Sequence, residues 1–229
     1  MVLSVNFVSH NDISHGMEAE TSLELLNFFI TKVADSVEKT GGFLDKIMGS
    51  QLIGVWGISP SSGEISDEVM NCLQSAINIR TTLWDLNIER EAEGKLPIRM
   101  YCGIHTGEVL AGSIGTSVFH NYTVTGKVLD DAAKFGDLNR LTETDIIISE
   151  EIRNLAETLI LAEELAIPES ENCNARLFGL VNLTPSQEHE IQRWPFTLID
   201  VQESLTAGRN IKDSDENNSG NADENGKAD

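Results

Sequence analysis

Apolar residues recur along the chain with two periods, and their succession predicts the order of the elements. Alternation over residues 2–8 predicts a strand, and apolar positions three and four apart over 18–37 predict an amphipathic helix. A hairpin signal at Gly49-Ser50 and a second helical pattern follow. The remaining predicted elements are strands 43–48, 51–58, 98–104, 121–125 and 145–148, and helices 66–93, 129–141 and 150–162.

This order of elements predicts the fold class. The sequence β-α-β-β-α-β over residues 2–104 is the ferredoxin-like arrangement, an α+β fold with a mostly antiparallel sheet and helices on one face. We expect one domain over 1–205, with a motif-bearing core at 2–155 and a C-terminal extension at 156–205. Residues 178–201 are apolar enough for a last strand or two, whereas the acidic stretch 206–229 lacks aromatic residues and should be a disordered tail.

Charge and cysteine content narrow the function classes. The chain has 16 Lys plus Arg against 37 Asp plus Glu, a net charge of −21, which disfavours binding to nucleic acid or to anionic lipid. Residues 143–171 hold nine acidic residues and one basic residue, and predict a solvated helical face. Because there is no apolar run of 18 residues and no signal peptide, we expect a cytoplasmic protein without membrane insertion. Three cysteines without a CxxC pair argue against disulfides and zinc.

Four glycines within residues 103–115 predict backbone that lies close to another backbone or to a ligand. The stretch is no P-loop, because no Gly-Lys-Ser/Thr closes it, and it lacks the context of a dinucleotide fingerprint. Together with LNIER at 86–90 and LPIR at 96–99, it resembles the class III adenylate/guanylate cyclase catalytic domain. The segment GGFLDKIMGSQLIGVWG at 41–57 resembles the second signature of that family, and YTVTG at 122–126 its third.

The resemblance implies a specific chemistry. Class III cyclases act as dimers, and two aspartates hold two metal ions at sites in the dimer interface. A lysine and an Asp or Thr read the base, while an Asn and an Arg steady the ribose and the developing charge. Lys46 and Thr123 stand at the two base-reading positions, where Thr goes with adenine. Both nucleotide-binding residues are therefore retained.

The other four functional positions of the family have changed. The metal-binding aspartates correspond to Ser9 and Ser50, whose neutral hydroxyls are poor ligands for Mg²⁺ or Mn²⁺. The Asn corresponds to Asp130, which cannot donate a hydrogen bond when ionised, and the Arg to Lys134, which lacks the bidentate fork. We therefore expect no intact catalytic set and no metal cofactor.

Two nearby carboxylates are candidates for replacing the missing metal ligands. Asp12 would need a shifted alignment and a loop that folds back. Asp45 adjoins Lys46, and by the alternation of a strand it should point to the opposite face from that lysine. We expect neither carboxylate to restore a metal site.

The favoured interpretation is a catalytically impaired cyclase-homology domain that acts as a dimerisation or regulatory module and keeps weak nucleotide binding. Its expected partners are a second copy or another cyclase-type domain, with ATP as ligand and no nucleic acid. One alternative is an active cyclase that converts ATP to cAMP, in a heterodimer or with a relocated Mg²⁺ or Mn²⁺ site. The other is a structural component of a larger assembly, in which the acidic face at 143–171 docks on a basic partner.

Overall fold

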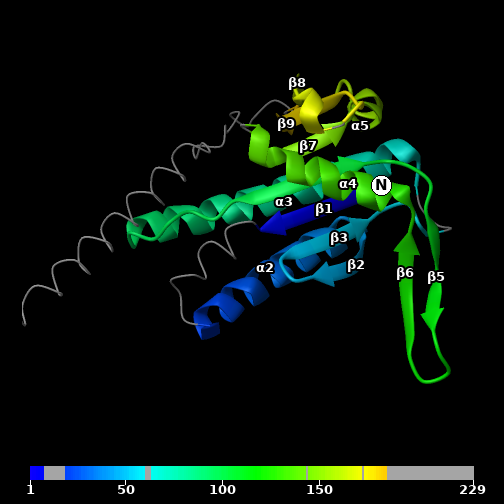
Figure 1. Cartoon of the computed structure of the whole chain (residues 1–229), viewed down its shortest axis with the longest axis horizontal. Coiled ribbons are helices and arrows are strands. Elements are labelled where there is room, and N and C mark those ends of the chain that lie inside the picture. Colours follow the sequence, from blue (N-terminus) through cyan, green and yellow to red (C-terminus); the bar gives the residue numbers. More distant parts are fainter. Residues whose placement is uncertain (8–18, 60–62, 143, 172, 185–229) are drawn as a thin grey trace, which may run out of the picture.

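The computed structural model describes residues 1–7, 19–59, 63–142, 144–171 and 173–184 (Figure 1). Its strands are β1 (Val2–Phe7), β2 (Phe43–Met48), β3 (Gln51–Val55), β4 (Met100–His105), β5 (Leu110–Gly115), β6 (His120–Thr125), β7 (Ile146–Ser149), β8 (Ile160–Glu164) and β9 (Leu177–Leu183). Its helices are α2 (Ala19–Lys39), α3 (Ile65–Ala92), α4 (Lys127–Asp137) and α5 (Glu150–Leu155), with short 3₁₀ turns η1 (Leu138–Leu141) and η2 (Glu169–Glu171).

Seven strands form one sheet in the order β2-β3-β1-β4-β7-β9-β8. Every neighbouring pair is antiparallel except β4 and β7, which run parallel. The predicted β-hairpin is present: β2 and β3 turn at Gly49, whose φ of 62° is a conformation that favours glycine. The predicted α+β fold with a mostly antiparallel sheet is therefore confirmed.

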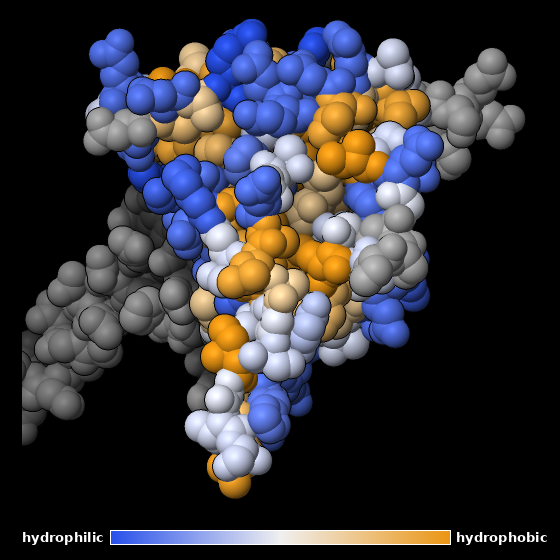
Figure 2. All heavy atoms as spheres, turned by 90° about the vertical axis from the view of Figure 1, so that its right-hand side faces the viewer, coloured by the Kyte–Doolittle hydropathy of each residue, from blue (hydrophilic) through white to orange (hydrophobic). Residues whose placement is uncertain are grey.

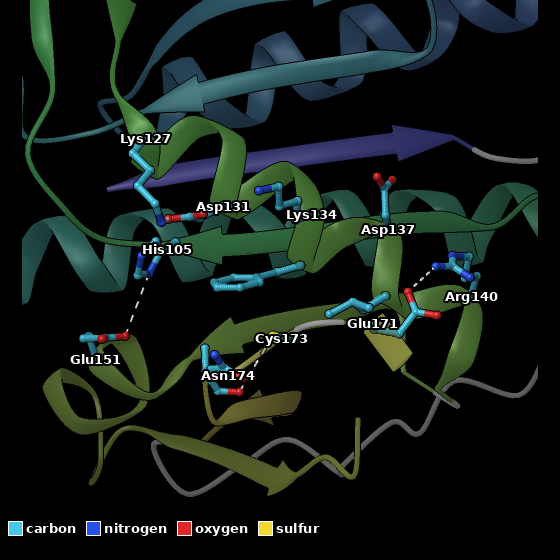
Figure 3. A pocket seen from close by; sticks show the side chains of 13 residues that line it. His105, Lys127, Asp131, Lys134, Asp137, Arg140, Glu151, Glu171, Cys173 and Asn174 are labelled. Atoms are coloured by element: carbon cyan, nitrogen blue, oxygen red, sulfur yellow. Dashed lines mark hydrogen bonds and ion pairs between the residues drawn. The ribbon is translucent and has the colours of Figure 1, made fainter. Parts of the chain in front are cut away.

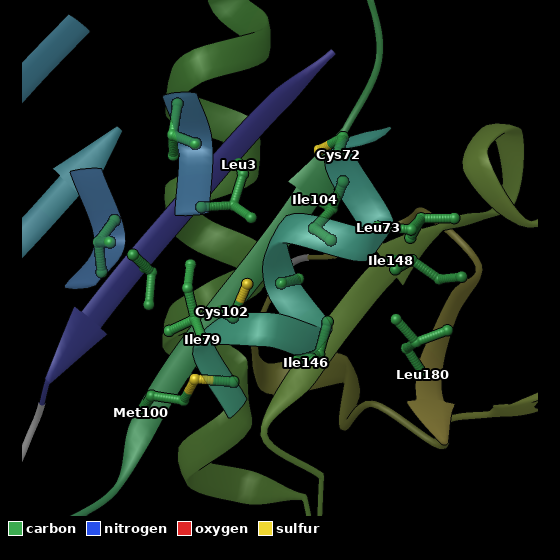
Figure 4. Close-up of a cluster of buried hydrophobic side chains, with 14 of the residues drawn as sticks. Leu3, Cys72, Leu73, Ile79, Met100, Cys102, Ile104, Ile146, Ile148 and Leu180 are labelled. Carbon is green, nitrogen blue, oxygen red and sulfur yellow. The ribbon is translucent and has the colours of Figure 1, made fainter. Parts of the chain in front are cut away.

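The main core lies between one face of the sheet and the two long helices α2 and α3. Alternate residues of β1, Leu3 and Val5, point to this face and are fully buried against the helices. Figure 4 shows the centre of this cluster, where Leu73 of α3 lies among side chains of β4 and β7. The two helices of the βαββαβ unit thus share one face, as predicted.

Helix α4, which follows that unit, covers the opposite face of the sheet. Val2 of β1 points to this side and packs with Val128, Leu129 and Ala132 of the helix. The helix approaches β4 very closely at Gly103: a Cβ at this position would lie 2.0 Å from the carbonyl oxygen of Ala132. This contact is the close backbone approach that the glycine-rich motif predicts.

Strands β5 and β6 form a separate two-stranded sheet, paired from Leu110↔Thr125 to Gly115↔His120. In Figure 1 this hairpin extends away from the body of the domain. We call residues 110–125 the arm. Its root, at Thr123 and Val124, contacts β2.

The predicted helix 150–162 is wrong in its second half. Helix α5 ends at Leu155, and Ile160–Glu164 forms the edge strand β8, which pairs with β9. A short apolar run does not distinguish helix from strand by itself, and pairing with β9 decides the outcome. Strand β9 is a last strand of the kind predicted within 178–201. Residues from 185 onward, including the predicted tail, lie outside the described residues.

The acidic segment 143–171 is helical only in part, and one of its carboxylates is buried. Asp145 accepts two hydrogen bonds from Arg80 of α3, at 2.7 Å from Nε and 2.6 Å from Nη2. The guanidinium also donates to the carbonyl oxygens of Leu180 and Val181 in β9. This pair therefore ties α3 to β7 and β9 instead of facing solvent. No helix in the part of the chain that the structure describes has the length and hydropathy of a membrane span.

Candidate functional site

Lys46 and Thr123 are 77 residues apart in the sequence and meet where β2 contacts the root of the arm. The ammonium nitrogen of Lys46 donates to Thr123 Oγ1 at 3.0 Å and to the carbonyl oxygen of Val124 at 2.6 Å. The lysine side chain is 31% exposed, so the pair is accessible from solvent. The structure thus brings together the two residues that the resemblance assigns to nucleotide binding.

Asp45 lies in the same cluster, and the prediction that it faces away from Lys46 is wrong. The pairing of β2 with β3 shifts between Leu44 and Lys46, which leaves Asp45 as the extra residue of a β-bulge. Strand alternation fails at a bulge, so both side chains turn toward the arm. Asp45 forms an ion pair with Lys46, and its Oδ1 accepts from Thr123 Oγ1 at 2.8 Å and from the backbone N–H of Val124 at 2.9 Å.

Ser50 occupies the hairpin turn next to the end of β1. Its hydroxyl donates to Asn6 Oδ1 at 2.8 Å, and its carbonyl oxygen accepts from the backbone N–H of Phe7. The oxygen atoms of Ser50 and Asn6 are neutral, so they do not fit the anionic set of metal ligands that Mg²⁺ prefers. Ser9 and Asp12 lie outside the described residues. Within the described ranges, no group of three or more His, Cys, Asp or Glu residues could hold a metal ion.

Asp130 and Lys134 lie one turn apart on α4, and both are exposed. Neither side chain forms a hydrogen bond or ion pair with another residue that the structure describes. Asp130 and Lys134 therefore present opposite charges on one helix, without contact to Lys46 or Ser50.

Lys134 also lines a cavity of about 560 Å³ beside α4 (Figure 3). In Figure 3, Lys127 and Asp131 of the same helix pair beside His105 at the end of β4. His105 Nδ1 lies 3.9 Å from a carboxylate oxygen of Glu151. Positive and negative groups thus alternate around this cavity.

Burial decides the charge of the histidine in this cavity. Desolvation lowers the pKa of His105, and the nearby carboxylates of Glu151 and Asp131 offset part of that effect. Its imidazole ring packs edge-on against Phe135 at a centroid distance of 5.3 Å. His105 is therefore mainly neutral at pH 7 and has a packing role.

Comparison with known proteins decides the family. The sequence profile of the adenylate and guanylate cyclase catalytic domain matches residues 2–167, more than half of the chain. The chain belongs to this family. Its cyclase fold is close to that of the adenylyl cyclase CyaB from P. aeruginosa, with a TM-score of 0.71 at 21% identity over 82% of this chain and 95% of the other. The guanylyl cyclase Cya2 gives a TM-score of 0.69 at 21% identity, covering 83% of this chain and 95% of that one.

Curated cyclases that match the chain are much longer. An adenylate cyclase of Anabaena cylindrica is 27% identical over 161 residues, which is 68% of this chain and 30% of the cyanobacterial protein. Adenylate cyclase type 10 of Oryctolagus cuniculus is 24% identical over 131 residues, covering 57% of this chain and 8% of that protein. This cyclase domain therefore spans less than a third of these relatives.

Sequence reasoning placed Asp45 on the wrong face of its strand and missed Asn6. The bulge at Asp45 depends on the tertiary contact with the arm, so alternation within the strand could not reveal it. Asn6 carries a usable signal, because it is a polar residue in an apolar strand, three residues before Ser9 at the metal-binding position of the family. Its pairing with Ser50 follows from the register of β1 with β3.

Proposed function

We propose that this cyclase domain does not catalyse cyclisation. It associates with a second cyclase-type domain through the arm, and it keeps weak binding of a purine nucleotide at Lys46 and Thr123. The observation that carries the proposal is the hydrogen bond between Ser50 and Asn6. A hydroxyl and an amide face each other at the corner where the family places carboxylate ligands.

The missing metal-binding carboxylates in this corner affect catalysis more than the retained pair Lys46 and Thr123 can offset. Hard divalent cations prefer anionic oxygen, and two metals are needed to activate the ribose hydroxyl and to neutralise the triphosphate. Losing one preorganised stabilising group costs about 10²–10³ in rate. This chain has lost both metal ligands and carries Asp130 and Lys134 where the family has Asn and Arg. Because family sites combine residues of both protomers, a homodimer would contain two sites with the same defects.

Association is supported by the apolar surface of the arm. Val118 is 92% exposed and Phe119 is 67% exposed at its tip, which Figure 2 shows as an orange end beneath the domain. Leu110, Ile114 and Tyr122 are exposed along the strands. A two-stranded hairpin is marginally stable by itself in water, so a partner surface that covers this arm would stabilise it. One neighbour with the same fold, a guanylyl cyclase domain from Blastocladiella emersonii, is described as a non-canonical dimer.

The activity test uses the purified full chain with ATP or GTP and Mn²⁺, and product detection by mass spectrometry. We expect no cyclic nucleotide above a protein-free control. A Ser9→Asp, Ser50→Asp double variant should gain Mn²⁺ binding by calorimetry, while the original chain shows none. Turnover that Lys46→Ala abolishes would overturn the proposal.

The association test measures mass by sedimentation equilibrium. A Val118→Asp, Phe119→Asp variant should dissociate, because each carboxylate would be desolvated in the interface. The matched control is Leu23→Asp, which places the same charge on an exposed leucine of α2. If the chain alone is a dimer and the arm variant stays dimeric, the arm is not the interface. If the chain alone is monomeric up to 100 µM, self-association is refuted.

An active cyclase remains the second candidate, because Lys46 and Thr123 lie 3.0 Å apart in an arrangement suited to reading a base. It would require a partner that supplies the metal-binding carboxylates. The acidic docking face receives less support. Four of its carboxylates form ion pairs within the domain: Glu150 and Glu164 with Arg176, Glu171 with Arg140, and Glu157 with Arg153.

A further inference from the structure

The side chain of Asp45 is fully buried beneath the candidate nucleotide site. One oxygen accepts hydrogen bonds from the hydroxyl of Thr123 and from the backbone N–H of Val124, and the other is paired with the ammonium of Lys46. A ligand cannot reach this carboxylate, because it has no exposed surface. Asp45 can therefore change the hydrogen bonds made to a ligand only through the groups that it contacts, Lys46, Thr123 and the backbone of Val124.

The hydrogen bonds fix the direction of every proton in the cluster. An ammonium group has three protons, and those of Lys46 point to Asp45, to Thr123 and to the carbonyl of Val124. A hydroxyl has one proton, and that of Thr123 points to Asp45. One lone pair of Thr123 Oγ1 accepts from Lys46, and one lone pair remains. Thr123 is half-buried, and its hydroxyl can therefore offer a ligand an acceptor but no donor.

We propose that Asp45 is a positioning residue that fixes the hydrogen-bonding polarity of Lys46 and Thr123, and so selects the purine. With Asp45 ionised, the cluster accepts a hydrogen bond from the exocyclic amino group of a 6-aminopurine. A 6-oxopurine would place its carbonyl oxygen against an acceptor and against a lysine whose protons are already engaged. The inference rests on the proposed nucleotide site and adds the residue that sets its selectivity.

The test compares ATP and GTP binding to the full chain by calorimetry. We expect the original chain to bind ATP about tenfold more tightly than GTP, since one mismatched polar contact is worth about that factor. Asp45→Asn replaces a carboxylate oxygen with an amide that donates, which releases the Thr123 proton or one Lys46 proton. The ratio of the two dissociation constants should then fall to within about threefold. Glu93→Gln, which removes an exposed carboxylate at the end of α3, should keep the original ratio.

The ratio of the two dissociation constants is the informative quantity. Partial unfolding would weaken the binding of both nucleotides equally, and this effect cancels in the ratio. Thr123→Val, which removes the hydroxyl itself, should reduce the ratio to the same level. Adding Asp45→Asn to Thr123→Val should change the ratio by less than Asp45→Asn does alone, since one of the two groups that Asp45 orients is already absent. If the original chain selects ATP and Asp45→Asn keeps that selectivity, the inference is overturned while the nucleotide site stands. If the original chain binds neither nucleotide, both are overturned.

Discussion

Replacing Gly103 with alanine tests whether the glycine-rich motif serves the scaffold. Gly103 is fully enclosed between β4 and α4, and an added Cβ would lie 2.0 Å from the carbonyl oxygen of Ala132 and 2.4 Å from the backbone nitrogen of Gly136. Real Cβ contacts are essentially never shorter than 3.0 Å. Both obstacles are backbone atoms, so no side chain can rotate away, and the helix must retreat by about 1 Å.

The cost follows from what the retreat exposes. Helix α4 buries Val128, Leu129 and Phe135 against the sheet. A gap of 0.5–1 Å forfeits roughly a quarter to a half of the dispersion energy of the facing atoms. Overpacking commonly costs about 1–3 kcal/mol, and here strain and loosened packing add. We therefore expect Gly103→Ala to lower the free energy of unfolding by about 3 kcal/mol. With a urea m-value of about 2 kcal/mol/M, the midpoint should fall by about 1.5 M.

The matched control comes from the same motif. A Cβ at Gly112 in β5 would meet no atom within 4 Å, so Gly112→Ala should leave the midpoint within about 0.3 M. Urea unfolding followed by far-UV circular dichroism measures both variants. Close packing at Gly103 is not the constraint if Gly103→Ala unfolds at the same urea concentration as the control, or if Gly112→Ala is the more destabilised of the two.

Three further predictions concern buried ionisable groups. Arg80→Met should lower the free energy of unfolding by about 3–5 kcal/mol, because it leaves Asp145 charged and unpaired. Urea unfolding of this variant and of the Arg80→Met, Asp145→Leu double variant measures the effect. A double variant no more stable than the single one would contradict the prediction. Of the three thiols, Cys173 alone should react rapidly with a thiol reagent at pH 8 in the folded protein. Burial raises the pKa of Cys72 to about 12 and raises that of Cys102 well above its usual value. Fast labelling of two thiols would disprove this prediction. Because burial lowers the pKa of His105, the imidazole binds a proton more readily in the unfolded chain than in the folded one, so the contribution of His105 to stability is lost as pH falls through about 6.5. The His105→Gln variant should therefore lose less stability than the original chain between pH 7 and pH 5.5. Equal losses in urea unfolding would refute this prediction.

The fold was largely predictable because its signals are local. The period of apolar residues gave α2 and α3, and Gly49 marked the hairpin turn. The error at 156–162 has a different origin. Strand β8 exists only because β9, which lies more than a dozen residues further along the chain, pairs with it, and no pattern within ILAEE shows that partner.

Most residues of the candidate site were predictable from the sequence, but their contacts were not. Lys46, Thr123 and Ser50 were found through their place in motifs, and the structure shows what each of them contacts. The side of the strand on which Asp45 lies depends on a bulge, and the bulge is held by hydrogen bonds from the root of the arm. A feature created by contacts across 78 residues leaves no trace in the local pattern.

The motifs that place this chain among the cyclases are explained by packing, and this limits what they say about chemistry. Gly103 is required by the approach of α4, and a Cβ at Gly42 would lie 2.4 Å from the ring of Trp56, whose indole N–H donates to the carbonyl of Thr40. At such positions the packing of the fold demands glycine, independently of catalysis. Ser50, by contrast, needs only a turn at its position, so the fold places no demand for a carboxylate there. A match that depends on packing residues such as Gly103 therefore identifies the fold. Only positions that packing does not constrain, such as Ser50, give information about catalysis.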